Sequence, residues 1–282
     1  MGELPGLALV AALLGLAVGS FLNVVIYRLP RMLERQWAQE EAHQAGQAPE
    51  QAPTYNLVHP PSACTHCGHP LAAWENLPVL SWLLLRGRCS ACHGRISLRY
   101  PAVELATAAL FVYAAWRWGP TPAAAAWAGF GATLLALALI DWDTTLLPDS
   151  LTLPLLWAGL VAAALGWSGT PLAEAFWGAV AGYLTLWSVY HAFLRLTGKQ
   201  GMGFGDFKLF AALGAWLGWQ ALIPVILLAS ITGAGVGITM KLTGSLREGG
   251  YVPFGPFLAL GGLAAMADGA HGFWLALGRL GG

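Results

Sequence analysis

Long apolar runs separated by short polar segments dominate the chain. A bilayer-spanning helix needs about 20 apolar residues. The runs therefore predict an all-α polytopic membrane protein with about eight transmembrane helices. They occupy residues 7–26, 102–118, 123–140, 151–167, 175–194, two stretches that flank Gln220, and a last stretch that starts near Phe254.

Composition supports a membrane protein over a soluble one. The 282 residues are 57% hydrophobic and only 10% charged, whereas about a quarter of the residues in a soluble domain are charged. No Lys or Arg precedes the first run, so we expect a spanning helix in contact with membrane lipid and not a signal peptide. The chain has zero net charge and no long charged tail, so nothing indicates a nucleic-acid partner.

The longest polar segment divides the chain into three predicted parts. Residues 1–28 form the first transmembrane helix, residues 29–100 form a small cysteine-bearing module between the first two helices, and residues 101–282 form a transmembrane core. Positive charges flank the module on both sides, and Lys and Arg favour the cytoplasmic side of a membrane. We therefore expect a cytoplasmic module, an N-terminus on the opposite, periplasmic side, and cytoplasmic connections at residues 141–149 and 197–206.

Four cysteines form two C-x-x-C pairs with 21 residues between them: Cys64, Cys67, Cys89 and Cys92. This pattern predicts a zinc-ribbon-like module in which four thiolates complete a tetrahedron around a structural Zn²⁺. Two disulfides and a redox site are the alternatives, and a reducing cytoplasm argues against disulfides. Three nearby histidines, His66, His69 and His93, could compete as ligands.

One glycine-rich stretch ends in an acid just before an apolar run. Residues 201–206 read Gly-Met-Gly-Phe-Gly-Asp, and glycine allows backbone angles and close approaches that other residues forbid. Asp206 would then enter a membrane-like helix directly from a flexible turn. The simplest structural explanation is that Asp206 caps the helix.

A second acidic cluster lies in the connection at residues 141–149. Asp149 follows Pro148 in a context typical of a helix N-cap. Asp141 ends an apolar run, where the helix macrodipole disfavours negative charge, so an acid there is a functional candidate. Asp141 and Asp206 share one predicted face, and two adjacent carboxyls can hydrolyse a peptide by acid–base catalysis. A proton or cation path through an ion-coupled carrier, or an assembly scaffold without proteolysis, stays open.

The order of motifs closely resembles the prepilin peptidases, the type IV leader peptidases of bacteria. The shared motifs include the cysteine pairs, the stretch from Ile140-Asp141 through Pro148-Asp149, and Gly-Met-Gly-Phe-Gly-Asp at residues 201–206. The others are Gly19-Ser20-Phe21-Leu22-Asn23 through Pro30, Trp74-Glu75-Asn76-Leu77-Pro78, Arg99-Tyr100-Pro101-Ala102-Val103-Glu104-Leu105 and Pro253-Phe254-Gly255-Pro256.

The resemblance implies a GxGD aspartic protease of the inner membrane, with Asp141 and Asp206 as the catalytic pair. Asp143 and Asp149 match family positions without an assigned catalytic role. The family cuts the basic leader of prepilins and pseudopilins after a glycine, in type IV pilus and type II secretion systems. Members with the cysteine module also N-methylate the new terminus with S-adenosylmethionine.

The sequence contains no recognisable cofactor-binding motif for the methyl-transfer activity. No G-x-G-x-x-G follows a predicted strand, so the sequence does not indicate which residues bind the methyl donor. Trp74, Glu75 and Asn76 carry no assigned role, and Glu104 is interpreted as a helix-end charge near Arg99. The sequence does not indicate the oligomeric state.

Overall fold

The computed structural model describes residues 4–46, 53–199, 201–245 and 252–280, with the side chains of the last helix described up to Ala267. The chain forms two compact units, Met1–Ala128 and Gly129–Gly282. Over the described residues the fold is all-helical, and its β-structure is limited to two isolated bridges, Ala63 with Pro70 and Arg88 with Arg95. The predicted all-α class is confirmed.

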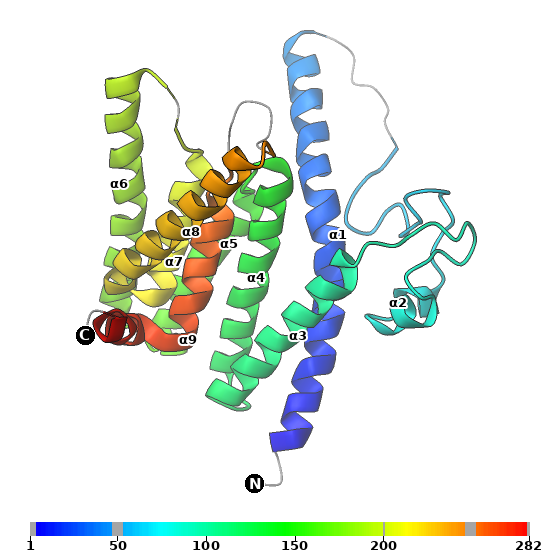
Figure 1. Ribbon diagram of the computed structural model, residues 1–282, viewed down its shortest axis with the longest axis horizontal. Helices are drawn as coiled ribbons and strands as arrows, with labels where there is room; N and C mark the ends of the chain where they lie inside the picture. Colours follow the sequence, from blue (N-terminus) through cyan, green and yellow to red (C-terminus); the bar gives the residue numbers. More distant parts are fainter. Residues whose placement is uncertain (1–3, 47–52, 200, 246–251, 281–282) are drawn as a thin grey trace. The chain divides into compact units, whose positions relative to one another are not determined.

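The helices follow one another along both units (Figure 1). In the first unit they are α1 (Leu4–Gln44), the 3₁₀ turn η1 (Ala73–Asn76), α2 (Leu80–Leu84) and α3 (Arg99–Trp118). Helix α4 (Pro122–Thr144) leads into the second unit, which continues with α5 (Asp149–Ala164), α6 (Leu172–Thr197), α7 (Phe204–Leu217), η2 (Trp219–Ala221), α8 (Leu222–Leu242) and α9 (Gly255–Leu280).

Each of the eight predicted apolar runs lies in a helix, but not every helix has the length and hydropathy of a complete span. Among the described residues three segments qualify: Pro5–Gln44, Pro122–Thr144 and Trp219–Leu242. Two shorter apolar helices, Asp149–Ala164 and Gly255–Ala267, accompany them. A membrane protein is therefore supported, and the number of eight spans stays a prediction.

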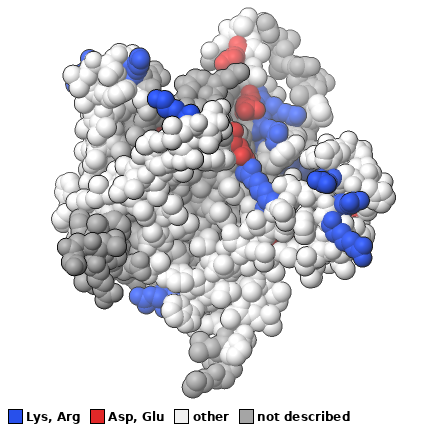
Figure 2. All heavy atoms as spheres, viewed as in Figure 1, with Lys and Arg blue, Asp and Glu red and all other residues white. Residues whose placement is uncertain are grey.

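The outer surface of the helices is suited to lipid. Most of the surface visible in Figure 2 carries no charged side chain. Large apolar side chains such as Leu196, Leu242 and Trp116 are 85%, 82% and 69% exposed. Burying side chains of this kind in a bilayer removes apolar area from water, which is favourable in proportion to that area.

Glycines allow the helices of the first unit to touch. Gly15 and Gly19, one turn apart on α1, face α3, and a methyl group added to them would lie 2.6 Å from the Cα atom of Ala108 and 2.7 Å from that of Glu104. Small residues at this spacing let helix backbones approach closely in membranes, where the hydrophobic effect does not drive helices together.

Helix α7 is the buried centre of the second unit. It packs against α5, α6 and α9, and every residue from Asp206 to Trp216 except Lys208 is buried. Gly178 and Gly182 of α6 and Gly214 of α7 face the opposite backbone directly. This surrounding protein explains why a helix of only 14 residues can be nearly all apolar.

Candidate functional site

Asp206 lies in the first turn of α7 and not at its cap. Gly203 is the N-cap residue, with extended backbone angles of φ −82° and ψ 151°. The Asp206 carboxylate reaches back to accept a hydrogen bond from the Gly203 N–H at 3.2 Å. The sequence-based explanation of Asp206 as the cap residue was therefore wrong in position, although the carboxylate does satisfy a donor of the helix end.

The second carboxyl oxygen of Asp206 has no such role. Asp206 is 3% exposed, and its Oδ1 atom is buried without a hydrogen-bond partner among the described residues. Leaving a buried polar atom unpaired costs about 1–3 kcal/mol. Capping therefore accounts for one oxygen of this acid and leaves the other unexplained.

Asp141 lies near the end of α4 and is 4% exposed. Its Oδ2 atom accepts a hydrogen bond of 2.9 Å from the N–H of Gly255, the first residue of α9. The positive end of the α9 macrodipole therefore faces this carboxylate and offsets the unfavourable end of α4. The expectation that no local structure stabilises a charge on Asp141 was wrong, because the stabilising helix begins 114 residues further along the chain.

Two glycines and one leucine bring these acids into the same neighbourhood. A methyl group on Gly255 would lie 2.6 Å from Oδ2 of Asp141 and 3.1 Å from the Leu147 side chain. A methyl group on Gly205, next to Asp206, would lie 2.6 Å from Cβ of the same Leu147. The carboxyls of Asp141 and Asp206 are close enough to interact electrostatically. Two acids 65 positions apart are thus joined in one buried site.

The other two acids of the cluster lie outside this site. Asp143 and Asp149 are exposed. The N-cap of α5 is Pro148, so the prediction that Asp149 caps this helix was wrong. Instead, Lys208 Nζ lies 2.6 Å and 2.7 Å from the two carboxylate oxygens of Asp149. This ion pair joins the start of α5 to the first turns of α7, two residues after Asp206.

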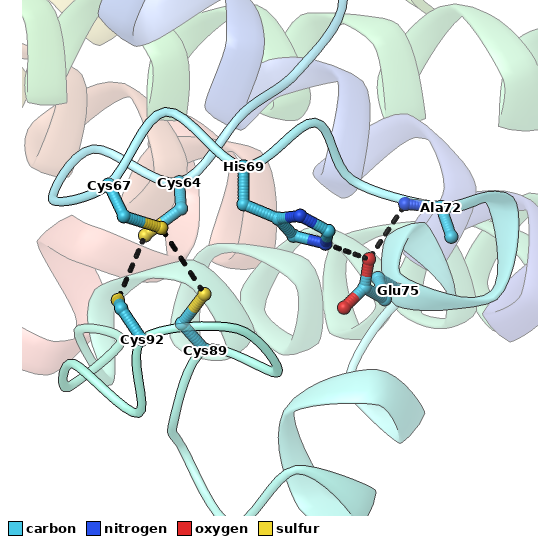
Figure 3. A network of polar contacts seen from close by, with 7 residues as sticks. All are labelled: Cys64, Cys67, His69, Ala72, Glu75, Cys89 and Cys92. Carbon is cyan, nitrogen blue, oxygen red and sulfur yellow. Dashed lines mark hydrogen bonds and ion pairs between the residues drawn. The ribbon is translucent and has the colours of Figure 1, made fainter.

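The four cysteines of the first unit form two matching knuckles. The N–H of Cys64 donates to the His69 carbonyl at 2.8 Å, and the N–H of Cys89 donates to the Gly94 carbonyl at 2.9 Å. Each knuckle turns through a left-handed residue, Gly68 at φ 72° and His93 at φ 56°. The same hydrogen bonds thus recur 25 residues apart, and both pairs of thiols point into one space (Figure 3).

The spacing of the sulfur atoms fits a tetrahedral metal. All four lie within 4.8 Å of one another, with Cys64 Sγ 3.9 Å from Cys92 Sγ and Cys67 Sγ 4.0 Å from Cys89 Sγ. A Zn–S distance of 2.3 Å implies about 3.8 Å between ligand sulfurs. All four cysteines are free thiols and form no disulfide. The donor set therefore fits Zn²⁺ without the histidines.

The surrounding hydrogen bonds fix the knuckles and favour ionisation of the Cys64 thiol. Backbone N–H groups of Cys67 and His66 lower the pKa of Cys64 to about 7, which favours the thiolate that binds metal. His69, a candidate ligand in the sequence, directs Nε2 to within 3.6 Å of the Glu75 carboxylate (Figure 3). The Ser90 hydroxyl and the Ala72 N–H lower the pKa of Glu75, so this acid links the two knuckles.

Three residues of the acid site were not identified from the sequence. Gly255 and Leu147 belong to motifs that the resemblance included without a role for either residue, and Lys208 lies two residues after the Gly-Met-Gly-Phe-Gly-Asp motif. Only their contacts, made across long stretches of chain, reveal what they do. The only feature of the sequence that could have indicated Leu147 and Lys208 is their position, two residues before Asp149 and two residues after Asp206.

Comparison with known proteins agrees with this architecture. Residues 13–118 match the model of the bacterial peptidase A24 N-terminal domain, and residues 128–238 match the model of the type IV leader peptidase family. A prepilin leader peptidase/N-methyltransferase of Pseudomonas putida is 54% identical over 91% of this chain and 88% of its own length. Proteins of the same name from Pseudomonas aeruginosa and Aeromonas hydrophila are each 53% identical over 90% of this chain and 88% of theirs. No solved structure matches the chain. On this evidence the chain belongs to the type IV leader peptidase family.

Proposed function

We propose that this protein cleaves the basic leader of prepilins and pseudopilins after a glycine and then N-methylates the new terminus. Family membership supports the reaction class, since the relatives carry both activities in their name. The observation that carries the peptidase assignment is that Asp141 and Asp206 are both buried and interact electrostatically. Neither the fold nor the relatives favour an ion-coupled carrier or a scaffold.

The acid pair has the features needed for general acid–base hydrolysis. Two buried carboxyls that interact electrostatically cannot easily ionise together, so the proposed pair shares one proton. The ionised member takes a proton from water, and the protonated member polarises the scissile carbonyl. Oδ1 of Asp206 accepts no hydrogen bond from the described residues, so it is the atom available to carry the shared proton.

The proposed topology places this chemistry at the cytoplasmic boundary of the inner membrane. Its support is the distribution of basic residues, with Arg28, Arg31 and Arg35 after the first apolar run and Arg195, Lys199 and Lys208 around the glycine-rich turn. We infer eight spans with the N-terminus in the periplasm. A prepilin is a transmembrane helix with a basic cytoplasmic leader, so its scissile bond would meet the acids at this depth.

The first unit would hold a structural zinc and serve methyl transfer. Cys64, Cys67, Cys89 and Cys92 would supply all four ligands, which leaves no open position for catalysis by the metal. S-adenosylmethionine would supply an activated methyl group. The intact cysteine knuckles and the match to the N-terminal family domain support this assignment.

The test is to reconstitute the purified protein in liposomes with a synthetic prepilin and S-adenosylmethionine. Mass spectrometry should show a product cut after the leader glycine and carrying one methyl group on its new terminus. A prepilin left intact by folded, zinc-containing protein would refute the peptidase. Cleavage without methylation would refute only the second activity.

A further inference from the structure

A cavity in the first unit lies among motifs that peptide cleavage does not use. It has a volume of about 380 Å³, within the range of about 300–1,000 Å³ typical of small-molecule sites. α1, the knuckles and the start of α3 form its walls. Three separate motifs contribute to its polar lining, through Ser20, Asn23, Glu75, Asn76, Tyr100 and Glu104, and Arg28, His66 and Arg95 add further polar groups.

Glu104 is the most unusual group in this wall. It is 7% exposed and lies in the second turn of α3. Its Oε2 atom accepts a 2.7 Å hydrogen bond from the N–H of Val79, and the Ser20 hydroxyl donates to the same carboxyl. The interpretation of Glu104 as a helix-end charge near Arg99 was therefore wrong, because this carboxyl is buried and held by Val79 and Ser20.

The partners of Glu104 fix its orientation but do not neutralise it. Both are neutral donors, and a buried carboxylate without a cation is costly. A cationic ligand in the cavity would remove that cost. An acid that is buried, held in place and directed into a pocket is therefore suited to recognise positive charge.

A guanidinium lines the same cavity about two helical turns further along α1 than Ser20. Arg28 is 8% exposed and lines the pocket. Its Nη1 atom donates to the Asn56 carbonyl at 3.0 Å, and a guanidinium has five N–H donors in all. Arg28 follows Ser20 by eight residues, about 12 Å along α1. Tyr27, Tyr100 and Trp82 add aromatic surface.

We propose that this cavity binds the methyl donor, with the Glu104 carboxylate at its sulfonium and Arg28 at its carboxylate end. The ligand class follows from the lining, which offers an anion for a cation, a cation for a carboxylate, and aromatic rings and hydroxyls for a nucleoside. The inference rests on the methyltransferase part of the proposed function and adds the site for it.

The position of the charge suits the reaction. The α-amine of the cleaved substrate attacks the methyl carbon, the N–C bond forms, and the C–S bond breaks with its electron pair kept by sulfur. The amine releases one proton to water, and the sulfonium becomes a neutral thioether. Glu104 therefore interacts with a charge that the donor has and the product lacks, so it should bind S-adenosylmethionine more tightly than the neutral product and favour release of that product after transfer.

The test compares two ligands that differ in this charge. Equilibrium dialysis measures the Kd of S-adenosylmethionine and of neutral S-adenosylhomocysteine for wild-type protein, Glu104→Gln and the exposed control Glu41→Gln. The amide oxygen of Gln can still accept from Val79, so a purely structural role survives the change. We expect Glu104→Gln to weaken S-adenosylmethionine at least about tenfold and S-adenosylhomocysteine by less than about threefold, with zinc content unchanged and Glu41→Gln like wild type.

Unchanged binding of both ligands by Glu104→Gln, or equal losses of both, would overturn the assignment. Photo-crosslinking of wild-type protein with labelled S-adenosylmethionine provides a second measurement. Label on peptides of the cavity wall supports the site, whereas label confined to residues 129–282 refutes it while leaving methyl transfer intact. If the wild type binds neither ligand and methylates nothing, the methyltransferase function itself fails and the site with it.

Discussion

The two units bury acids in different surroundings. In the second unit Asp141 and Asp206 interact with each other, and each accepts one backbone N–H at a helix start. In the first unit Glu104 faces a cavity that also contains Arg28. Two like charges forced together favour sharing of a proton, whereas an acid and a guanidinium spaced around a cavity favour binding of a ligand of mixed charge. We infer from this difference that the second unit hydrolyses the peptide and that the first unit binds the methyl donor.

The largest expected effect separates two acids that are two residues apart on α4. Asp141→Asn should reduce leader cleavage about 10³-fold, in line with the 10²–10⁴ contributed by general acid–base groups. Asp143→Asn, the matched control at an exposed position, should stay within about twofold since it leaves the buried pair intact. Single-turnover cleavage of a prepilin in liposomes measures both rates. Equal reductions of the cleavage rate in the two variants would contradict the assignment of catalysis to the buried acid alone.

The next effect concerns the metal of the first unit. Replacing Cys64 and Cys89 by Ser removes one ligand from each knuckle, so zinc should fall from about one per chain to less than a tenth of that. Methylation should be lost with it, because the knuckles form part of the cavity wall. Metal analysis and methyl transfer on the same preparation test this, with the exposed Glu41→Gln as a control that leaves the thiols and the cavity wall in place. A zinc-free wild type would refute the site.

A smaller effect, on stability, should distinguish packed glycines from open ones. Gly214→Ala directs a methyl group into the backbone of Gly178 and should lower the free energy of unfolding by about 1–3 kcal/mol or more. Gly15→Ala should do the same in the first unit. Gly235→Ala on α8 meets nothing within 4 Å and should be neutral or stabilising by up to about 1 kcal/mol. Thermal unfolding in detergent ranks the three, and a Gly214→Ala protein as stable as wild type would contradict the close helix contact.

The smallest effect tests the ion pair beside the acid site. Lys208 is 28% exposed and Asp149 is 56% exposed in their side chains, and such surface pairs contribute about 0–1 kcal/mol. Lys208→Met and Asp149→Asn should each slow cleavage by less than about fivefold. Because both remove the same contact, the double variant should be no slower than the worse single one. If the reduction in the double variant equals the product of the two single reductions in cleavage rate, the two residues act separately.

The local sequence was sufficient to predict the elements and the chemistry of the knuckles. Each apolar run became a helix because its length and composition leave few other ways to satisfy the backbone in an apolar setting. The two C-x-x-C pairs brought four sulfurs together as expected. Asp141 and Asp206 could be paired from their common predicted face and from the family resemblance.

Errors arose where a distant segment determined the local environment. Asp141 is stabilised by Gly255, and Asp149 binds Lys208 instead of capping its own helix. Glu104 is held by Val79 and Ser20, each far away in sequence. Propensity and macrodipole rules describe one helix at a time, so they cannot anticipate a second helix end or a loop that arrives from elsewhere in the fold.

The most direct test of the central claim is the cleavage rate of Asp206→Asn. Asn keeps an oxygen that can accept from the Gly203 N–H, so the helix end stays satisfied while the ionisable group is lost. With zinc content and thermal unfolding unchanged, we predict a single-turnover cleavage rate reduced about 10³-fold. A folded Asp206→Asn protein that cleaves prepilin at the wild-type rate would show that this acid only caps α7, and the acid-pair mechanism would be wrong.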